Sequence, residues 1–108
     1  MEKLIRDKLI DKYDIPYRPC NDACEYEHLL GLKLVEESNE VQHEVELLAN
    51  GWHSQSRKKL IEELADVKEV IDAILSTYKI SWDNIIEVQK AKAVLNGKFE
   101  KGIILSKE

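Results

Sequence analysis

Residues that interrupt helices are confined to a few points of this chain. The 108 residues include only four glycines and two prolines. Both prolines lie within residues 14–21, and proline cannot continue a helix, so we expect a loop there. Leucine, isoleucine, valine, glutamate and lysine dominate the composition, which favours helices. The sequence therefore predicts an all-α chain, with a partly helical segment over residues 1–13 ahead of the loop.

Capping signals predict where three further helices begin and end. Asp22 and Ser81 are residue types that cap helix N-termini. The Asn-Gly pairs at 50–51 and 96–97 are typical of helix C-termini. The predicted helices cover residues 23–48, 57–78 and 82–95, with a linker at 52–56.

Length and charge limit the class of protein. A chain of this length forms one domain, here residues 1–108. The longest apolar runs are three residues, so we expect no membrane span, and the first residues lack a secretory signal. The net charge of −5 does not favour binding to a nucleic acid polymer. We therefore expect a cytoplasmic protein.

Both long helices carry an apolar stripe that is interrupted by acids. At 100° per residue, the stripe of the first helix is Leu30, Leu34, Val41, Val45 and Leu48. The stripe of the second helix is Leu60, Leu64, Val67, Ile71, Ile74 and Tyr78. Glu37 falls inside the first stripe and Glu63 inside the second, while Glu40 and Asp66 border them. Each helix thus projects two carboxylates, three residues apart, from a largely apolar face.

Antiparallel packing of these two helices would bring the four acids together. Converging buried carboxylates repel one another and need compensation. Mg²⁺, or Mn²⁺ as the alternative, prefers carboxylate oxygens and would supply it. The competing interpretation is a solvated acidic face, or ion pairs with Lys33 or the basic residues 57–59.

Other side chains are candidates for contacts with a phosphorylated ligand. Cations that could bind phosphate are Arg6, Lys8, Lys33, Lys98 and Lys101. Aromatic side chains that could stack on a base are Trp52, Trp82 and Phe99. The competing interpretation is that the lysines are solvated at helix ends and that the aromatic residues form core or subunit contacts.

The acids have the spacing E-E-x-x-E at residues 36–40 and E-x-x-D at residues 63–66. This pattern resembles the all-α nucleoside triphosphate pyrophosphohydrolase superfamily, which includes MazG-like proteins and phosphoribosyl-ATP pyrophosphohydrolase. Residues 3–8 (K-L-I-R-D-K) look like the opening of a small single-domain MazG-like subgroup. Residues 97–103 (G-K-F-E-K-G-I) look like its close, so the resemblance covers nearly the whole chain.

The resemblance implies a helical bundle assembled as a homodimer or homotetramer. It implies Mg²⁺-dependent cleavage of a nucleoside triphosphate between the α and β phosphates, which gives a monophosphate and pyrophosphate. Glu37, Glu40, Glu63 and Asp66 match the metal ligands of the superfamily. Glu36 matches an acid that supports the site or orients water, so Glu36 and Glu37 are the candidate catalytic residues.

Three alternatives remain open at the level of sequence. Phosphoribosyl-ATP pyrophosphohydrolase uses the same ligands on another nucleotide. A non-catalytic helical module would dimerise through the same stripes, and a nucleotide sensor would bind without turnover. A role in removing non-standard nucleotides rests on the resemblance alone. Self-association would also cover the apolar residues of the third predicted helix.

Overall fold

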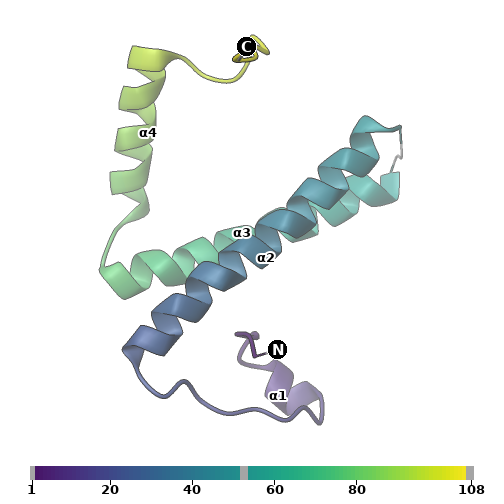
Figure 1. Ribbon diagram of the computed structural model, residues 1–108, viewed down its shortest axis with the longest axis vertical. Coiled ribbons are helices and arrows are strands. Elements are labelled where there is room, and N and C mark those ends of the chain that lie inside the picture. The colour runs from purple at the N-terminus through teal and green to yellow at the C-terminus, as the bar shows by residue number, and fades with distance from the viewer. Residues whose placement is uncertain (1, 52–53, 107–108) are drawn as a thin grey trace.

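The computed structural model describes residues 2–51 and 54–106, and these form helices and connecting segments without a β-strand (Figure 1). The helices are α1 (Leu9–Lys12), α2 (Ala23–Ala49), α3 (Ser54–Tyr78) and α4 (Trp82–Asn96). The all-α prediction is confirmed. Within the described part of the chain, no helix is long and apolar enough to cross a membrane.

The predicted N-caps begin their helices. The Asp22 carboxylate accepts a hydrogen bond from the Glu25 backbone N–H at 2.8 Å, and this holds the first turn of α2. Ser81 and Asn84 form a reciprocal capping box at the start of α4. These two helix starts are fixed by local sequence, as predicted.

The start of α3 differs from the sequence prediction, and its end lacks the glycine that is typical of helix C-termini. The helix begins at Ser54, so the predicted linker at 52–56 is wrong for residues 54–56. It ends at Tyr78 without a glycine, because Lys79 adopts a left-handed conformation with φ 55°. The Ile80 N–H then donates to the Leu75 carbonyl at 2.9 Å, which closes the helix end.

The packed centre of the molecule is the pair α2 and α3, and α3 returns alongside α2 in Figure 1. Its buried apolar residues are Leu30, Val70 and Leu75. The predicted stripes are too wide for this contact, since one neighbouring helix covers only one line of side chains. Three residues of the predicted stripes are accordingly about half exposed, namely Val45, Leu64 and Tyr78.

Helix α4 stands apart from the α2–α3 pair (Figure 1). Its first residue is held to α3, because Trp82 Nε1 donates to Asp72 at 2.5 Å and Lys68 Nζ lies 5.2 Å from the centre of the indole. Farther along, its apolar side chains are exposed, and so are those of the following segment; the most exposed are Val94, Leu95, Phe99, Ile103, Ile104 and Leu105.

The shape of the single chain is accordingly open. Its radius of gyration is 17.5 Å, against about 13 Å for a compact domain of this length. Its accessible surface is 9697 Å², against roughly 6,200 Å² for a compact monomer of this mass. One chain therefore forms a helical hairpin with an appended helix and does not by itself form a closed bundle.

The small core makes each buried apolar residue important. We expect Leu30→Ala to lower the free energy of unfolding by about 2–4 kcal/mol, because it leaves a cavity between α2 and α3. Leu32→Ala is the matched control, since Leu32 lies on the same helix with 52% of its surface exposed. Urea unfolding of both variants checks this, and equal losses would contradict the assigned core.

Candidate metal centre

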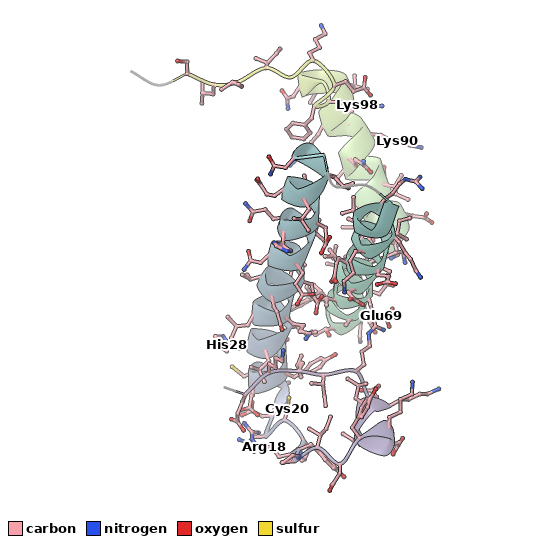
Figure 2. All side chains as sticks on the ribbon, turned by 90° about the vertical axis from the view of Figure 1, so that its right-hand side faces the viewer. Arg18, Cys20, His28, Glu69, Lys90 and Lys98 are labelled. Carbon is pink, nitrogen blue, oxygen red and sulfur yellow. The ribbon has the colours of Figure 1, made fainter. Side chains whose placement is uncertain are left out.

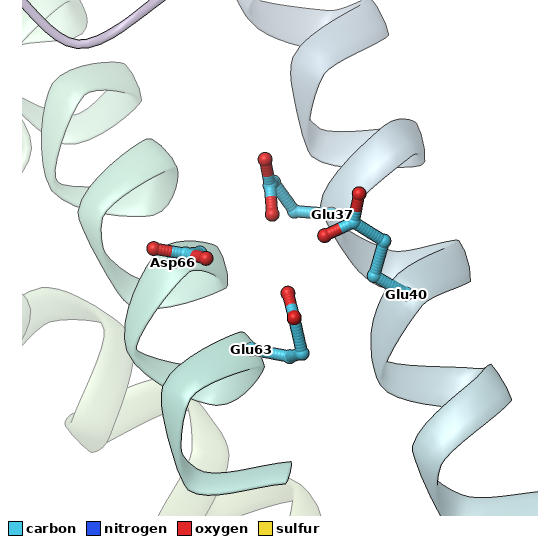
Figure 3. Close-up of side chains that lie close together, drawn as sticks. All are labelled: Glu37, Glu40, Glu63 and Asp66. Atoms are coloured by element: carbon cyan, nitrogen blue, oxygen red, sulfur yellow. The ribbon is translucent and has the colours of Figure 1, made fainter. Parts of the chain in front are cut away.

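Four acids from facing turns of α2 and α3 converge on one point (Figure 3). Glu37 and Glu40 come from α2, and Glu63 and Asp66 come from α3. One carboxylate oxygen from each residue lies within 4.8 Å of those from the other three. The three-residue spacing on each helix places both of its acids on the side that faces the other helix.

The two acids inside the predicted stripes are buried. Glu37 is 7% exposed and Glu63 is 8% exposed. The Oε2 atom of each is buried without a hydrogen-bond partner among the described residues. A buried carboxylate oxygen without a partner is unfavourable, and each of these oxygens could be a ligand for a cation.

The pKa values of two of these acids reflect this environment. Burial raises the pKa of Glu37, although Lys33 opposes the shift. Interaction with the neighbouring Glu63 carboxylate raises the pKa of Glu40, and burial adds to the effect. Both shifts mean that the folded chain disfavours the charged forms of Glu37 and Glu40.

Basic side chains contact the acids from the rim of the cluster. Arg6 Nη2 lies 2.6 Å from Asp66 Oδ1. Lys33 Nζ lies 3.3 Å from Glu37 Oε1, and Lys59 Nζ lies 3.8 Å from Glu63 Oε1. These contacts compensate one oxygen of each residue and leave the partnerless oxygens of Glu37 and Glu63 uncompensated.

Glu36 lies outside the cluster and binds two lysines. Lys3 Nζ donates to Glu36 at 2.6 Å, and Lys33 Nζ donates at 3.0 Å. The hydrogen bond from Lys3 is the main reason that the pKa of Glu36 lies below its ordinary value. Glu36 therefore stays ionised and holds Lys3 and Lys33 beside the acids.

A pocket of about 720 Å³ lies next to the cluster, between residues 3–9 and the two long helices. Glu37 and Asp66 belong to both the pocket wall and the acid cluster. The basic side chains in its lining are Lys3, Arg6, Lys8 and Lys33. The rest of the lining is mainly apolar, and α2 and α3 contribute Leu30, Val70 and Ala73 to it together with Tyr26 and Glu69.

The structure brings together only part of the predicted phosphate and base contacts. Arg6, Lys8 and Lys33 line the pocket, whereas Lys98 and Lys101 do not. Figure 2 shows Lys98 beyond the end of α4, at the opposite end of the molecule from Arg18.

The three predicted aromatic contacts lie elsewhere. Trp82 packs against α3 outside the pocket, and the Phe99 side chain is fully exposed. Trp52 lies outside the described residues.

Sequence reasoning missed Tyr26, the aromatic residue of the pocket, and the acid Glu69. The signal for Tyr26 was present, because Tyr26, Leu30, Lys33 and Glu37 follow one another at helical spacing along one face of α2. Glu69 stands three residues after Asp66 on α3 in the same way. Glu44 of α2 is also buried, with 7% of its surface exposed.

The donor set fits a hard divalent cation. Four carboxylates at short mutual distances, two of them with buried unpartnered oxygens, are typical ligands for Mg²⁺ or Mn²⁺. In comparisons with known proteins, no family model matches this chain, and neither a curated protein nor a solved structure matches it. The resemblance to MazG-like proteins stays a prediction from the sequence motifs.

The raised pKa values predict how stability depends on pH. An acid with a raised folded-state pKa takes up protons more readily in the folded chain, so the free energy of unfolding falls as pH rises above its ordinary value of 4.5. With chelator present, we expect the midpoint temperature of thermal unfolding to be higher at about pH 5 than at about pH 7. Glu36, with its lowered pKa, opposes this only below 4.5.

Glu37→Gln tests the cause of this pH dependence. We expect it to raise the free energy of unfolding at pH 7 by about 1 kcal/mol and to flatten the pH dependence, since a buried charge is removed. Lys33 keeps Glu36 as a partner in this variant. Glu46→Gln, on an exposed part of α2, is the control and should change neither quantity. A less stable Glu37→Gln protein would contradict the assignment.

Proposed function

We propose that this chain is a Mg²⁺-dependent pyrophosphohydrolase of nucleoside triphosphates. In this reaction one water is consumed, the bridging bond between the α and β phosphates breaks, and the products are a monophosphate and pyrophosphate. The observation that carries the proposal is the four-acid cluster, with its buried unpartnered oxygens, at the edge of a pocket lined by cations. The E-E-x-x-E and E-x-x-D motifs supply the reaction class.

Glu37, Glu40, Glu63 and Asp66 would hold the cation. When bound, the cation would neutralise phosphate charge and make a water molecule more acidic. The protein supplies the rest of the charge balance. Lys3 and Lys33, held by Glu36, stand beside the acids and would bind phosphate oxygens.

The same geometry makes Glu36 a positioning residue in this proposal. Its low pKa makes it a weak proton acceptor, and both of its lysine contacts direct positive charge to the pocket. Glu40 is the exposed member of the four acids, so a carboxylate oxygen of Glu40 that does not hold the cation would be free to accept a proton from water.

The lining of the pocket contains the two kinds of side chain that a nucleotide needs. Its basic side chains, of which Arg6 contacts Asp66 and Lys33 contacts Glu37, would bind the phosphates. Its apolar side chains and Tyr26 would accommodate the nucleoside. Lys98 and Lys101 do not line this pocket, so they could contact the ligand only from a second copy of the chain.

Release of pyrophosphate from a panel of standard and modified nucleoside triphosphates, with phosphoribosyl-ATP included, tests the reaction. We expect release with Mg²⁺ and none with chelator. We expect Glu63→Gln to lower kcat by roughly 100-fold or more, because a metal ligand is lost. Glu62→Gln changes the adjacent exposed residue and should leave the rate unaltered.

The rival functions give different results in this experiment. Turnover of phosphoribosyl-ATP alone would identify that activity in place of the general one. Thermal stabilisation by nucleotide without product would indicate a sensor. Absence of both product and a Mg²⁺-dependent thermal shift would mean that the acids are structural, as in a non-catalytic module.

We also propose that the chain self-associates as a homodimer or homotetramer and so completes a helical bundle. Its surface exceeds that of a compact monomer by roughly 3,500 Å², and a standard interface needs only about 800 Å² from each partner. The exposed apolar side chains of α4 and the segment after it supply such a surface.

Sedimentation velocity tests self-association. We expect a dimer or tetramer at about 10 µM, and we expect Leu95→Asp to shift it towards monomer, because a charge would be buried at the contact. Gln89→Asp places the same charge at an exposed polar position of α4 as a control. A wild-type protein that sediments only as monomer would refute the proposal.

A further inference from the structure

Residues 2–8 are here called the N-terminal strap, and residues 3–8 of it line the pocket. Three side chains of the strap, Glu2, Lys3 and Arg6, form ion pairs with other parts of the chain. Arg18 binds Glu2 through two hydrogen bonds of 2.9 Å. Lys3 binds Glu36, and Arg6 binds Asp66. Of these ties, only the one from Arg6 reaches an acid of the proposed metal centre.

The contact between Arg6 and Asp66 differs from the other cation contacts of the cluster. Among the described residues, it is the hydrogen bond that joins a basic side chain to one of the four acids. Lys33 approaches Glu37 but donates to Glu36 instead, and Lys59 stays 3.8 Å from Glu63. Asp66 is therefore hydrogen-bonded to a counter-ion, whereas Glu37 and Glu63 each keep a buried oxygen without a partner.

A divalent cation bound by Asp66 would compete with Arg6 for the charge of the same carboxylate. The Oδ1 atom accepts the Arg6 hydrogen bond, and one oxygen of this carboxylate is also the atom that Asp66 offers to the cluster. The Arg6 side chain is 57% exposed and already lines the pocket. Its guanidinium can turn towards the pocket while the strap stays tied through Glu2 and Lys3.

We propose that Arg6 exchanges partners: it is the counter-ion of Asp66 in the cation-free chain and becomes an anion ligand in the pocket once Asp66 binds a divalent cation. The inference rests on the proposed metal centre and adds to it a coupling between cation binding and anion binding. Because the exchange couples the two sites, a divalent cation raises the affinity for a phosphate-bearing ligand, and the reverse holds to the same extent.

The proposal predicts changes of opposite sign when Arg6 is replaced. In Arg6→Gln, Asp66 no longer has to give up a partner, so we expect Mn²⁺ alone to bind about two- to fivefold more tightly, as the loss of an exposed ion pair allows. With Mn²⁺ saturating, methylenediphosphonate, a pyrophosphate analogue that cannot be cleaved, should bind at least about tenfold more weakly. Titration calorimetry measures both affinities without turnover.

Arg18→Gln is the matched control. It removes the same charge and loosens the same strap, but the acids that bind Arg18 are Glu2 and Glu25, outside the cluster. We expect both affinities to stay within twofold of wild type. A tighter Mn²⁺ site in Arg18→Gln as well would show that net charge or strap mobility is the cause, and would overturn the exchange.

The outcomes separate this inference from the proposed function. A wild-type chain that binds no Mn²⁺ would refute the metal centre and the exchange together. Wild-type binding and turnover, with Mn²⁺ affinity unchanged or weaker in Arg6→Gln, would overturn the exchange alone. Tighter Mn²⁺ binding with unchanged methylenediphosphonate affinity would also overturn it, because Arg6 would then be only a counter-ion.

Discussion

Repulsion among four carboxylates at the contact of α2 and α3 is the constraint around which the molecule is arranged. Glu37 and Glu63 occupy positions where a helical hairpin would normally bury leucine or valine. The apolar contact is therefore interrupted, and the buried apolar residues that remain are Leu30, Val70 and Leu75. A hairpin built this way is weak unless the negative charge is balanced, because each buried carboxylate opposes folding.

Basic residues supply part of this balance, and their placement explains why the N-terminal strap lies across the helices. Arg6 compensates Asp66, and Lys3 with Lys33 surrounds Glu36. The strap contains no helix before α1, and these ion pairs, with the one between Glu2 and Arg18, tie it to the rest of the chain. Lys3, Arg6 and Lys33 compensate acids and also line the pocket, so side chains that help the chain to fold also give the pocket its positive charge.

The sequence predicted what local rules determine. Asp22 and Ser81 begin their helices as expected, since capping involves only the next three residues. Helical periodicity placed all four acids of the cluster on facing sides of α2 and α3. Periodicity does not tell how much of a stripe a neighbouring helix covers, and Val45 and Leu64 of the stripes are about half exposed. The pocket was missed because it depends on contacts between residues that are far apart in the sequence. Arg6 of the strap and Asp66 of α3, for example, are separated by 60 residues.

Two kinds of acid cluster can be told apart by their response to added cations. In a structural cluster, each acid is paired with a base, so removal of either partner destabilises the fold and a divalent cation has little to bind. Here the bases contact the rim, while one oxygen of Glu37 and one of Glu63 remain buried and unpartnered. A ligand that binds only the folded chain stabilises it by mass action. If the cluster binds a cation as proposed, the same acids that weaken the isolated hairpin would make its stability depend on cation concentration, which a structural cluster would not do.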